Sequence, residues 1–192
     1  MAVVKSVIVE KNQIINTYAQ LWNVASLFLE KAEEDQTGST WASMASLVFT
    51  AFSLEAYFNH IGEKVFKSWN ALENLPPLNK LDVICEKLEI KLDYSRRPYQ
   101  TIKALFKFRN ELAHGKTVRL SNKEILNLNV DIDKYLGEHL KAWWQKYCTQ
   151  DSAVRAREDS EKIMRLVHES AKIKDDPLFF LGIGSHSAKV TA

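Results

Sequence analysis

The segment from residue 40 to residue 66 limits the possible folds most, because it is apolar on nearly all sides of a helix. Its large apolar residues are Met44, Leu47, Val48, Phe52, Leu54, Tyr57, Phe58, Ile61 and Val65. Such a helix buries most of its surface, so we expect it to be the central helix of a bundle, capped at its start by Ser39 or Thr40. A strip of small polar residues either lets a neighbouring helix approach closely or lies on a less buried side: Ser43, Ser46, Thr50 and Ser53.

The rest of the chain is also periodic, and its 192 residues include only 6 Gly and 4 Pro. Apolar spacing predicts further helices over residues 10–34, 78–88, 98–114, 131–147 and 151–172, with a capping box opening a short turn at residues 121–124. The sequence therefore predicts an all-α fold, a helical bundle of four to five main helices with a C-terminal helical extension. We expect residues 1–150 to form the bundle, and residues 151–192 to pack as a helix and tail on the bundle or on a dimer partner.

Several classes of protein are disfavoured by the composition. No apolar stretch is long enough to cross a bilayer, and Lys5 and Ser6 break the apolar run at the start, so we expect a cytoplasmic protein with no membrane partner. Cys85 and Cys148 form no spacing motif and fall on apolar helical faces, which predicts buried free thiols. No Gly-rich phosphate loop is present, and no third ligand accompanies the pair His60 and Glu63. We therefore predict no cofactor and no metal.

The most informative polar residues lie at the end of the helix predicted over residues 98–114. They are Arg109, Asn110 and His114, and Gly115 follows directly, where we expect the positive φ of a helix C-terminus. A guanidinium, an amide and an imidazole can cleave RNA without a metal. The imidazole takes the proton of the attacking 2′-OH, and the guanidinium stabilises the charge that develops on the phosphate. The alternative is structural, with Arg109 paired to Glu55 or Glu111 and His114 capping the helix.

The spacing of this motif is unfavourable for a site within one helix. Arg109 and His114 are five residues apart, which turns them about 140° from each other around an ideal helix. They converge only if the helix loosens at His114, or if each meets its counterpart from a second chain across a two-fold axis. A dimer would place two arginines and two histidines around one cleft.

Positive charge is concentrated around the motif. Residues 95–123 carry eight basic residues and one acidic residue, a net charge of +7 in a chain whose total is +2. This concentration favours a polyanionic partner, with Lys103, Lys107, Lys116 and Arg119 as the candidate RNA-binding residues. A solvated basic face without a partner is the equally weighted alternative. Trp143 and Trp144 are able to stack on bases, although one core and one interface residue is the commoner arrangement.

The sequence Phe-Arg-Asn-Glu-Leu-Ala-His-Gly-Lys at residues 108–116 resembles the Arg-x(4–6)-His signature of the HEPN superfamily (higher eukaryotes and prokaryotes nucleotide-binding domains). The segment Ser-Leu-Glu-Ala-Tyr-Phe-Asn at residues 53–59 resembles the second long helix of these domains, and the resemblance covers residues 11–148. It implies a dimeric helical bundle that acts as a metal-independent ribonuclease, with Arg109 and His114 as the catalytic pair and Asn110 as the accessory polar residue.

Further expectations follow from this resemblance. Many such ribonucleases are toxins in toxin–antitoxin systems or effectors of antiviral defence, so a cognate antitoxin or a nucleotidyltransferase is an expected partner besides RNA. Glu55 and Asn59 lie one turn apart and are possible accessory residues of the cleft, or Glu55 only neutralises Arg109. Family members without the motif are binding modules. The alternative function is therefore a non-catalytic helical module that binds nucleic acid or a partner protein.

Overall fold

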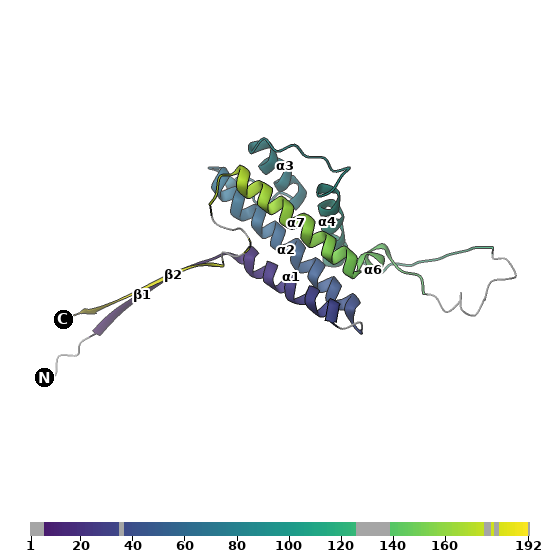
Figure 1. The fold of residues 1–192 in the computed structure, drawn as a ribbon, viewed down its shortest axis with the longest axis horizontal. Coiled ribbons are helices and arrows are strands. Elements are labelled where there is room, and N and C mark those ends of the chain that lie inside the picture. Colours follow the sequence, from purple (N-terminus) through teal and green to yellow (C-terminus); the bar gives the residue numbers. More distant parts are fainter. Residues whose placement is uncertain (1–5, 35–36, 126–138, 175–177, 179–180, 192) are drawn as a thin grey trace.

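The computed structural model describes residues 6–34, 37–125, 139–174, 178 and 181–191, and its fold is mainly helical. The main helices are α1 (Thr17–Glu34), α2 (Ser39–Val65), α3 (Pro77–Lys87), α4 (Tyr99–Ala113) and α7 (Gln150–Ser170). Two short elements accompany them, the 3-10 helix η1 (Trp69–Ala71) and α6 (Trp143–Tyr147). Figure 1 shows the long helices gathered into one bundle, which confirms the predicted all-α fold class.

Helix α2 is the central element, as its apolar sequence predicts. It packs against α1, α3, α4 and α7, and its large side chains Leu47, Leu54, Tyr57, Phe58 and Ile61 are fully buried. The other helices complete this core with one apolar face each, including Ile84 of α3, Leu105 of α4 and Met164 of α7. The free energy of folding gained by burying such side chains is about 1.5–3 kcal/mol each.

The small polar strip of α2 is buried against α1, which settles its predicted role as a site of close approach. The hydroxyl of Ser46 donates to the carbonyl oxygen of Ala25 at 2.9 Å, and that of Ser53 donates to the carbonyl oxygen of Tyr18 at 2.7 Å. The start of α2 differs from the prediction. Neither Ser39 nor Thr40 caps the helix, because the N-cap is Gly38 in the left-handed region at φ 96°, where no side chain supplies a cap hydrogen bond.

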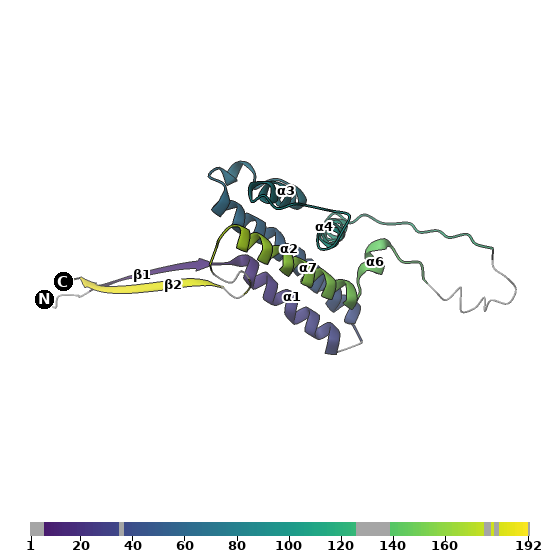
Figure 2. The same ribbon diagram turned by 45° about the horizontal axis from the view of Figure 1, so that its top comes forward.

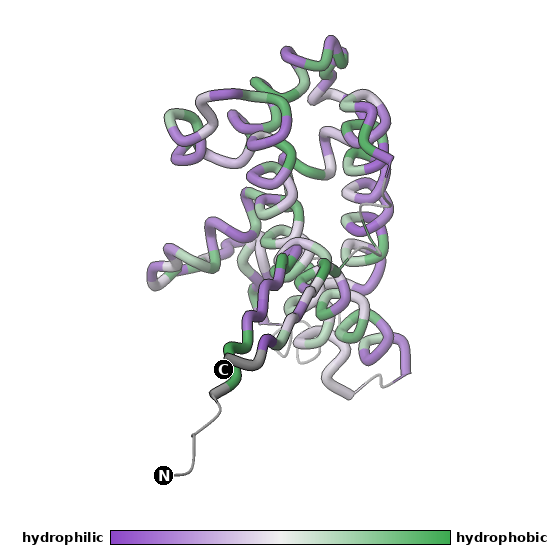
Figure 3. The backbone as a smooth tube through the Cα atoms, turned by 90° about the vertical axis from the view of Figure 1, so that its left-hand side faces the viewer, coloured by the Kyte–Doolittle hydropathy of each residue, from purple (hydrophilic) through white to green (hydrophobic). Residues whose placement is uncertain are grey.

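The two ends of the described chain form an antiparallel ribbon that the sequence analysis missed. Strand β1 (Ser6–Ile15) pairs with β2 (Gly182–Thr191), with Ser6 opposite Thr191 and Ile15 opposite Gly182. Figures 1 and 2 show this ribbon projecting from the bundle. The helix predicted from residue 10 is therefore wrong over residues 10–15, which are β-strand. In Figure 3 the outer part of β1 is hydrophobic and its middle is hydrophilic, and the valines and isoleucines at both ends of the strand are exposed.

Two other predicted elements differ from the structure. Residues 121–125 are not helical, and the amide of Asn122 donates to the carboxylate of Glu124 instead of forming the expected capping box. The helix predicted over residues 131–147 is observed only as α6 at its end, since residues 139–142 are irregular and residues 131–138 lie outside the described residues.

A buried carboxylate joins the start of α4 to the middle of α7. Asp159 is fully buried and accepts two hydrogen bonds from Arg97, at 2.7 Å and 2.9 Å, and one from the Thr101 hydroxyl at 2.6 Å. Burial acts to raise the pKa of Asp159, but these hydrogen bonds and the charge of Arg97 outweigh burial and hold the pKa below its usual value. The contact fixes α4, and α4 carries the motif.

Candidate functional site

The exposed face of α4 forms one wall of a groove. The opposite walls come from the start of α3, from α6 and from residues 116–120, and the volume of this open groove is about 1240 Å³. The α4 residues that line it recur at helical spacing: Gln100, Lys103, Ala104, Phe106, Lys107, Asn110, Glu111 and His114. The opposite face of the same helix is buried through Ile102, Leu105 and Phe108. The groove is therefore the solvent side of an amphipathic helix, flanked by these three segments.

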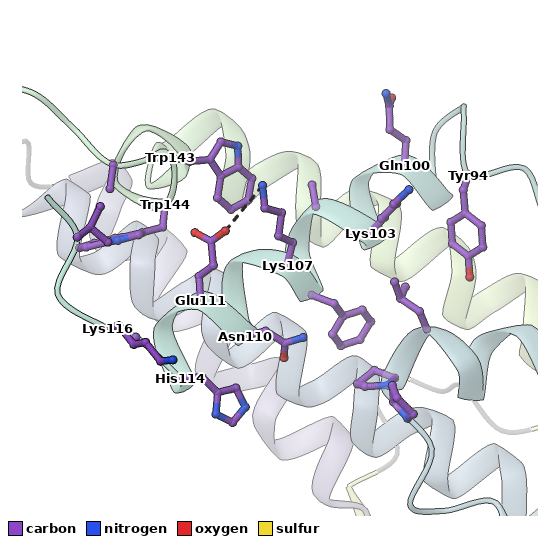
Figure 4. A pocket seen from close by; sticks show the side chains of 18 of the residues that line it. Tyr94, Gln100, Lys103, Lys107, Asn110, Glu111, His114, Lys116, Trp143 and Trp144 are labelled. Atoms are coloured by element: carbon purple, nitrogen blue, oxygen red, sulfur yellow. Dashed lines mark ion pairs between the residues drawn. The ribbon is translucent and has the colours of Figure 1, made fainter. Parts of the chain in front are cut away.

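His114 is the C-cap residue of α4 and is exposed. Its backbone N–H donates to the carbonyl oxygen of Asn110 at 3.0 Å, so the last turn closes without loosening. Figure 4 shows the side chains of Asn110 and His114 on the same side of α4, beside the groove that both line. The structure thus brings these two motif residues together and leaves the imidazole accessible.

Gly115 does not take the predicted backbone conformation. The glycines with positive φ in the described residues are Gly38 and Gly182, and Gly115 is not one of them. A Cβ at Gly115 would lie 3.1 Å from the carbonyl oxygen of Glu111. Close approach to the last turn of α4, and not a left-handed conformation, is therefore the steric reason that favours glycine here.

Arg109 faces α2 and not the groove. Its guanidinium forms an ion pair with Glu55, its side chain is only 15 % exposed, and it does not line the cavity that contains His114. The guanidinium also lies 5.9 Å from the ring centroid of Phe52 and 5.8 Å from that of Phe106. The five-residue spacing therefore has the effect expected from helix geometry, since one chain does not direct Arg109 and His114 into the same groove.

The two predicted accessory residues both face Lys80, which the sequence analysis missed. The ammonium of Lys80 donates to the side-chain oxygen of Asn59 at 2.8 Å and lies 3.8 Å from the carboxylate of Glu55. Lys80 is only 3 % exposed, an unusual position for a lysine. The signal for it was its place four residues before Ile84, on the buried face of α3. Glu55 neutralises Arg109, as the structural alternative proposed, and it is shared with a second cation.

Three of the four predicted RNA-binding residues line the groove. They are Lys103, Lys107 and Lys116, whereas Arg119 is exposed outside it. Lys107 lies 3.7 Å from the carboxylate of Glu111 and places its ammonium 4.2 Å from the ring centroid of Trp143. Glu111, the only acidic residue of this basic stretch, is thus paired with one of its lysines.

Aromatic residues also line the groove, namely Trp143, Trp144 and Tyr94.

Outside the groove, Cys85 and Cys148 are free and buried, as predicted, and burial raises their pKa values to about 12 and about 11. In the part of the chain that the structure describes, no group of three or more His, Cys, Asp or Glu residues is placed to hold a metal ion. No helix within the described ranges is both long and apolar enough to span a membrane.

Comparisons of this chain with protein-family models, with curated proteins and with solved structures find no match.

Proposed function

We propose that this protein is a metal-independent endoribonuclease of the HEPN type. The observation that carries the proposal is the accessible imidazole of His114, which lies beside Asn110 on a groove that Lys103, Lys107 and Lys116 also line. An accessible imidazole next to several cations is what general acid–base cleavage of a phosphodiester requires. A buried His114 would have contradicted this function.

The reaction uses the 2′-OH of RNA as the nucleophile. A neutral His114 imidazole accepts the 2′-OH proton while the 2′-oxygen forms a bond to phosphorus. The bond from phosphorus to the 5′-oxygen breaks, and the His114 imidazolium formed in this way donates its proton to that leaving oxygen. The products are a 2′,3′-cyclic phosphate and a 5′-hydroxyl. Asn110 is placed to hold a phosphate oxygen, and DNA, which lacks the 2′-OH, is not a substrate.

Arg109 has a role in this reaction only if a second chain completes the site. Arg109, Glu55 and Lys80 form a partly buried group of three charges whose formal sum is +1. The Nε of Arg109 is buried without a hydrogen-bond partner among the described residues. We propose that the phosphate lies between the His114 of one chain and the Arg109 of the other, in an isologous dimer.

The surface beside Arg109 supports a homodimer. Phe52 of α2 is 40 % exposed, and its ring makes an edge contact with the partly buried Phe49. An apolar patch next to a partly buried arginine is typical of protein–protein interfaces, where aromatic residues and arginines contribute most of the binding energy. Association through this patch would bury Phe52 and bring a second chain to Arg109.

A second function, that of a non-catalytic RNA-binding module, is favoured by one observation. Arg109 is held by Glu55 and does not enter the groove, so within a single chain the groove has binding groups without the arginine. Such a module would bind RNA through its lysines and leave the strand intact.

The test is incubation of single-stranded RNA with the protein in EDTA, which separates the two functions. We expect cleavage by the wild type, with 2′,3′-cyclic phosphate ends, and a loss of at least 100-fold in His114→Ala and Arg109→Ala, in the range of a general acid–base group. His186→Ala is the matched control, because His186 is exposed near the middle of β2, on the ribbon and outside the groove. Cleavage that persists in both motif variants contradicts the proposal, and binding without cleavage supports the module.

A further inference from the structure

The groove beside His114 combines an apolar surface with charged edges. The apolar part comes from several segments: Pro76, Pro77, Leu78, Phe106, Val118, Leu120 and Ala142. The three lysines Lys103, Lys107 and Lys116 line the same cavity. A ligand that fits both parts has a planar apolar body and a negative charge beside it. A nucleotide has this chemistry, whereas an acidic peptide lacks the apolar body and an apolar peptide does not require the lysines.

The two indoles of α6 give this groove a surface for a base. Trp143 stacks with Tyr147 at a centroid distance of 5.1 Å and an interplanar angle of 15°, and Tyr147 contacts the fully buried ring of Phe108 at 5.3 Å. The Trp143 ring is therefore anchored to the core, yet it remains 37 % exposed. An aromatic side chain held in place loses little conformational freedom when a base stacks on it.

Lys107 occupies the position over the Trp143 ring that a base would take. Its ammonium lies 4.2 Å from the ring centroid. The same ammonium forms an exposed ion pair with the carboxylate of Glu111, at 3.7 Å. Exposed ion pairs of this kind contribute little to stability, so Lys107 is easily displaced. A bound nucleotide can replace both contacts of Lys107. Its base stacks on the indole in place of the ammonium, and its phosphate pairs with the ammonium in place of the Glu111 carboxylate.

The indoles lie close to the proposed cleavage site. Figure 4 shows Trp143 and Trp144 at the end of α4 that carries Glu111 and His114, while Tyr94 lies towards the other end, near Gln100. A side chain can stack on a base only when that base is unpaired, because the bases of an A-form duplex are stacked on one another and its major groove is narrow. The groove therefore suits a single strand.

We infer that this groove binds an unpaired nucleotide next to the scissile phosphate, with its base on Trp143 and Trp144 and its phosphate on Lys107. The inference rests on the proposed ribonuclease function and adds the place where a base of the single-stranded substrate binds. It gives the two tryptophans a role in substrate recognition and leaves the chemistry to His114 and Arg109.

The test is a binding measurement that does not depend on cleavage. Fluorescence anisotropy compares three labelled 2′-O-methyl probes of equal length: a single strand, its duplex, and a strand with the same phosphates but abasic sites. Because the 2′-oxygens are blocked, none of them is cleaved. We expect the single strand to bind about tenfold more tightly than the abasic strand and the duplex, as stacking of one or two bases predicts.

Variants of the two tryptophans then test where the bases of the probe bind. Trp144→Ala and Trp143→Phe should reduce the preference for the single strand over the abasic strand at least threefold, and the phenylalanine retains a ring to stack with Tyr147. Trp41→Ala is the matched control, because Trp41 is 68 % exposed at the start of α2 and does not line the groove. Circular dichroism and thermal unfolding establish that each variant is folded.

Several outcomes overturn the inference. Equal binding of the abasic and normal strands means that the lysines bind phosphates alone, and a tighter duplex excludes a single-strand groove. A preference for the single strand over the abasic strand that persists in both tryptophan variants means that the bases bind elsewhere. If none of the probes binds, the groove does not bind nucleic acid. A wild type that binds single strands as expected but does not cleave RNA contradicts the proposed function and not the groove.

Discussion

The carboxylate of Glu55 holds the guanidinium of Arg109 on the α2 side of α4, while the imidazole of His114 lies on the groove side of the same helix. The arginine and the histidine of the motif are thus directed to different surfaces of one chain. A shared site requires a second chain, and the ion pair fixes which face of α4 that chain must approach.

A mixture of two inactive variants tests this arrangement. Arg109→Ala and His114→Ala are each expected to lose cleavage, but chains mixed after mild dissociation should regain about a quarter of the wild-type rate. The reason is that random pairing gives half mixed dimers, each with one intact pairing of Arg109 and His114 from opposite chains. The measurement is the initial rate of RNA cleavage in the mixture. No recovery, in a mixture that forms dimers, means that the site lies within one chain.

The buried charges around Glu55 predict a stability effect. Glu55→Ala leaves the buried ammonium of Lys80 beside Arg109 with no carboxylate, so we expect the free energy of unfolding to fall by about 3 kcal/mol. The control is Glu161→Ala, which removes a partly exposed i,i+4 ion pair with Arg165 at 2.8 Å and should cost less than about 0.5 kcal/mol. Urea denaturation followed by circular dichroism measures both, and equal losses would mean that Glu55 has no special part in the fold.

The contact between α4 and α7 predicts a pH-dependent stability. Because the pKa of folded Asp159 lies below the usual aspartate value of 3.8, its ionised form stabilises the fold at neutral pH, and this contribution is lost as the pH falls through the lowered pKa. Asp159→Asn should therefore lower the free energy of unfolding by about 2 kcal/mol at pH 7, with a smaller difference from wild type below about pH 4.

Urea titrations at several pH values measure this difference between wild type and Asp159→Asn. The matched control is Glu158→Gln, whose exposed carboxylate lies 3.3 Å from the same Arg97. It should leave stability almost unchanged at every pH. A destabilisation by Asp159→Asn that is constant from neutral to acid would show that the carboxylate charge does not contribute.

The end of α2 gives a prediction about packing. The indole of Trp69 lies directly against the backbone of Gly62, in the space that a Cβ at residue 62 would occupy. Although alanine is the better helix former, Gly62→Ala should lower the free energy of unfolding by about 2 kcal/mol, because the buried indole has to move. Thermal unfolding measures this, with Gly184→Ala in the exposed ribbon as the control. A more stable Gly62→Ala would show that the indole moves at little cost.

The helices of the bundle were predictable from the sequence because their apolar spacing is local. Residues 98–114 were predicted as a helix and form α4 at Tyr99–Ala113, since Pro98 favours its start and an apolar face runs along its length. The burial of α2 was equally readable, because no exposed helix carries apolar residues on most sides.

The ribbon was not predictable in the same way. Ile14 continued the helical stripe of Tyr18 and Leu21 by coincidence, while the β-branched residues of the first strand find their partners 167 to 183 residues later in the chain. Pairing over such a separation leaves no periodic signal in either segment. The same holds for the site, because the approach of Lys80 to Glu55 and of Trp143 to Lys107 depends on how helices pack, and local spacing does not encode it.

The last two residues of helix α4 are held less firmly than its start. Arg97 and Thr101 secure its start to Asp159 of α7, whereas its last residues, Ala113 and His114, are exposed. Amide hydrogens of the last turn should therefore exchange with solvent sooner than those of the first turns, and positional fluctuation should increase towards the imidazole. A bound strand or a second chain would damp this motion at the imidazole that we propose as the proton-transfer group, so substrate capture and ordering of that group would occur together.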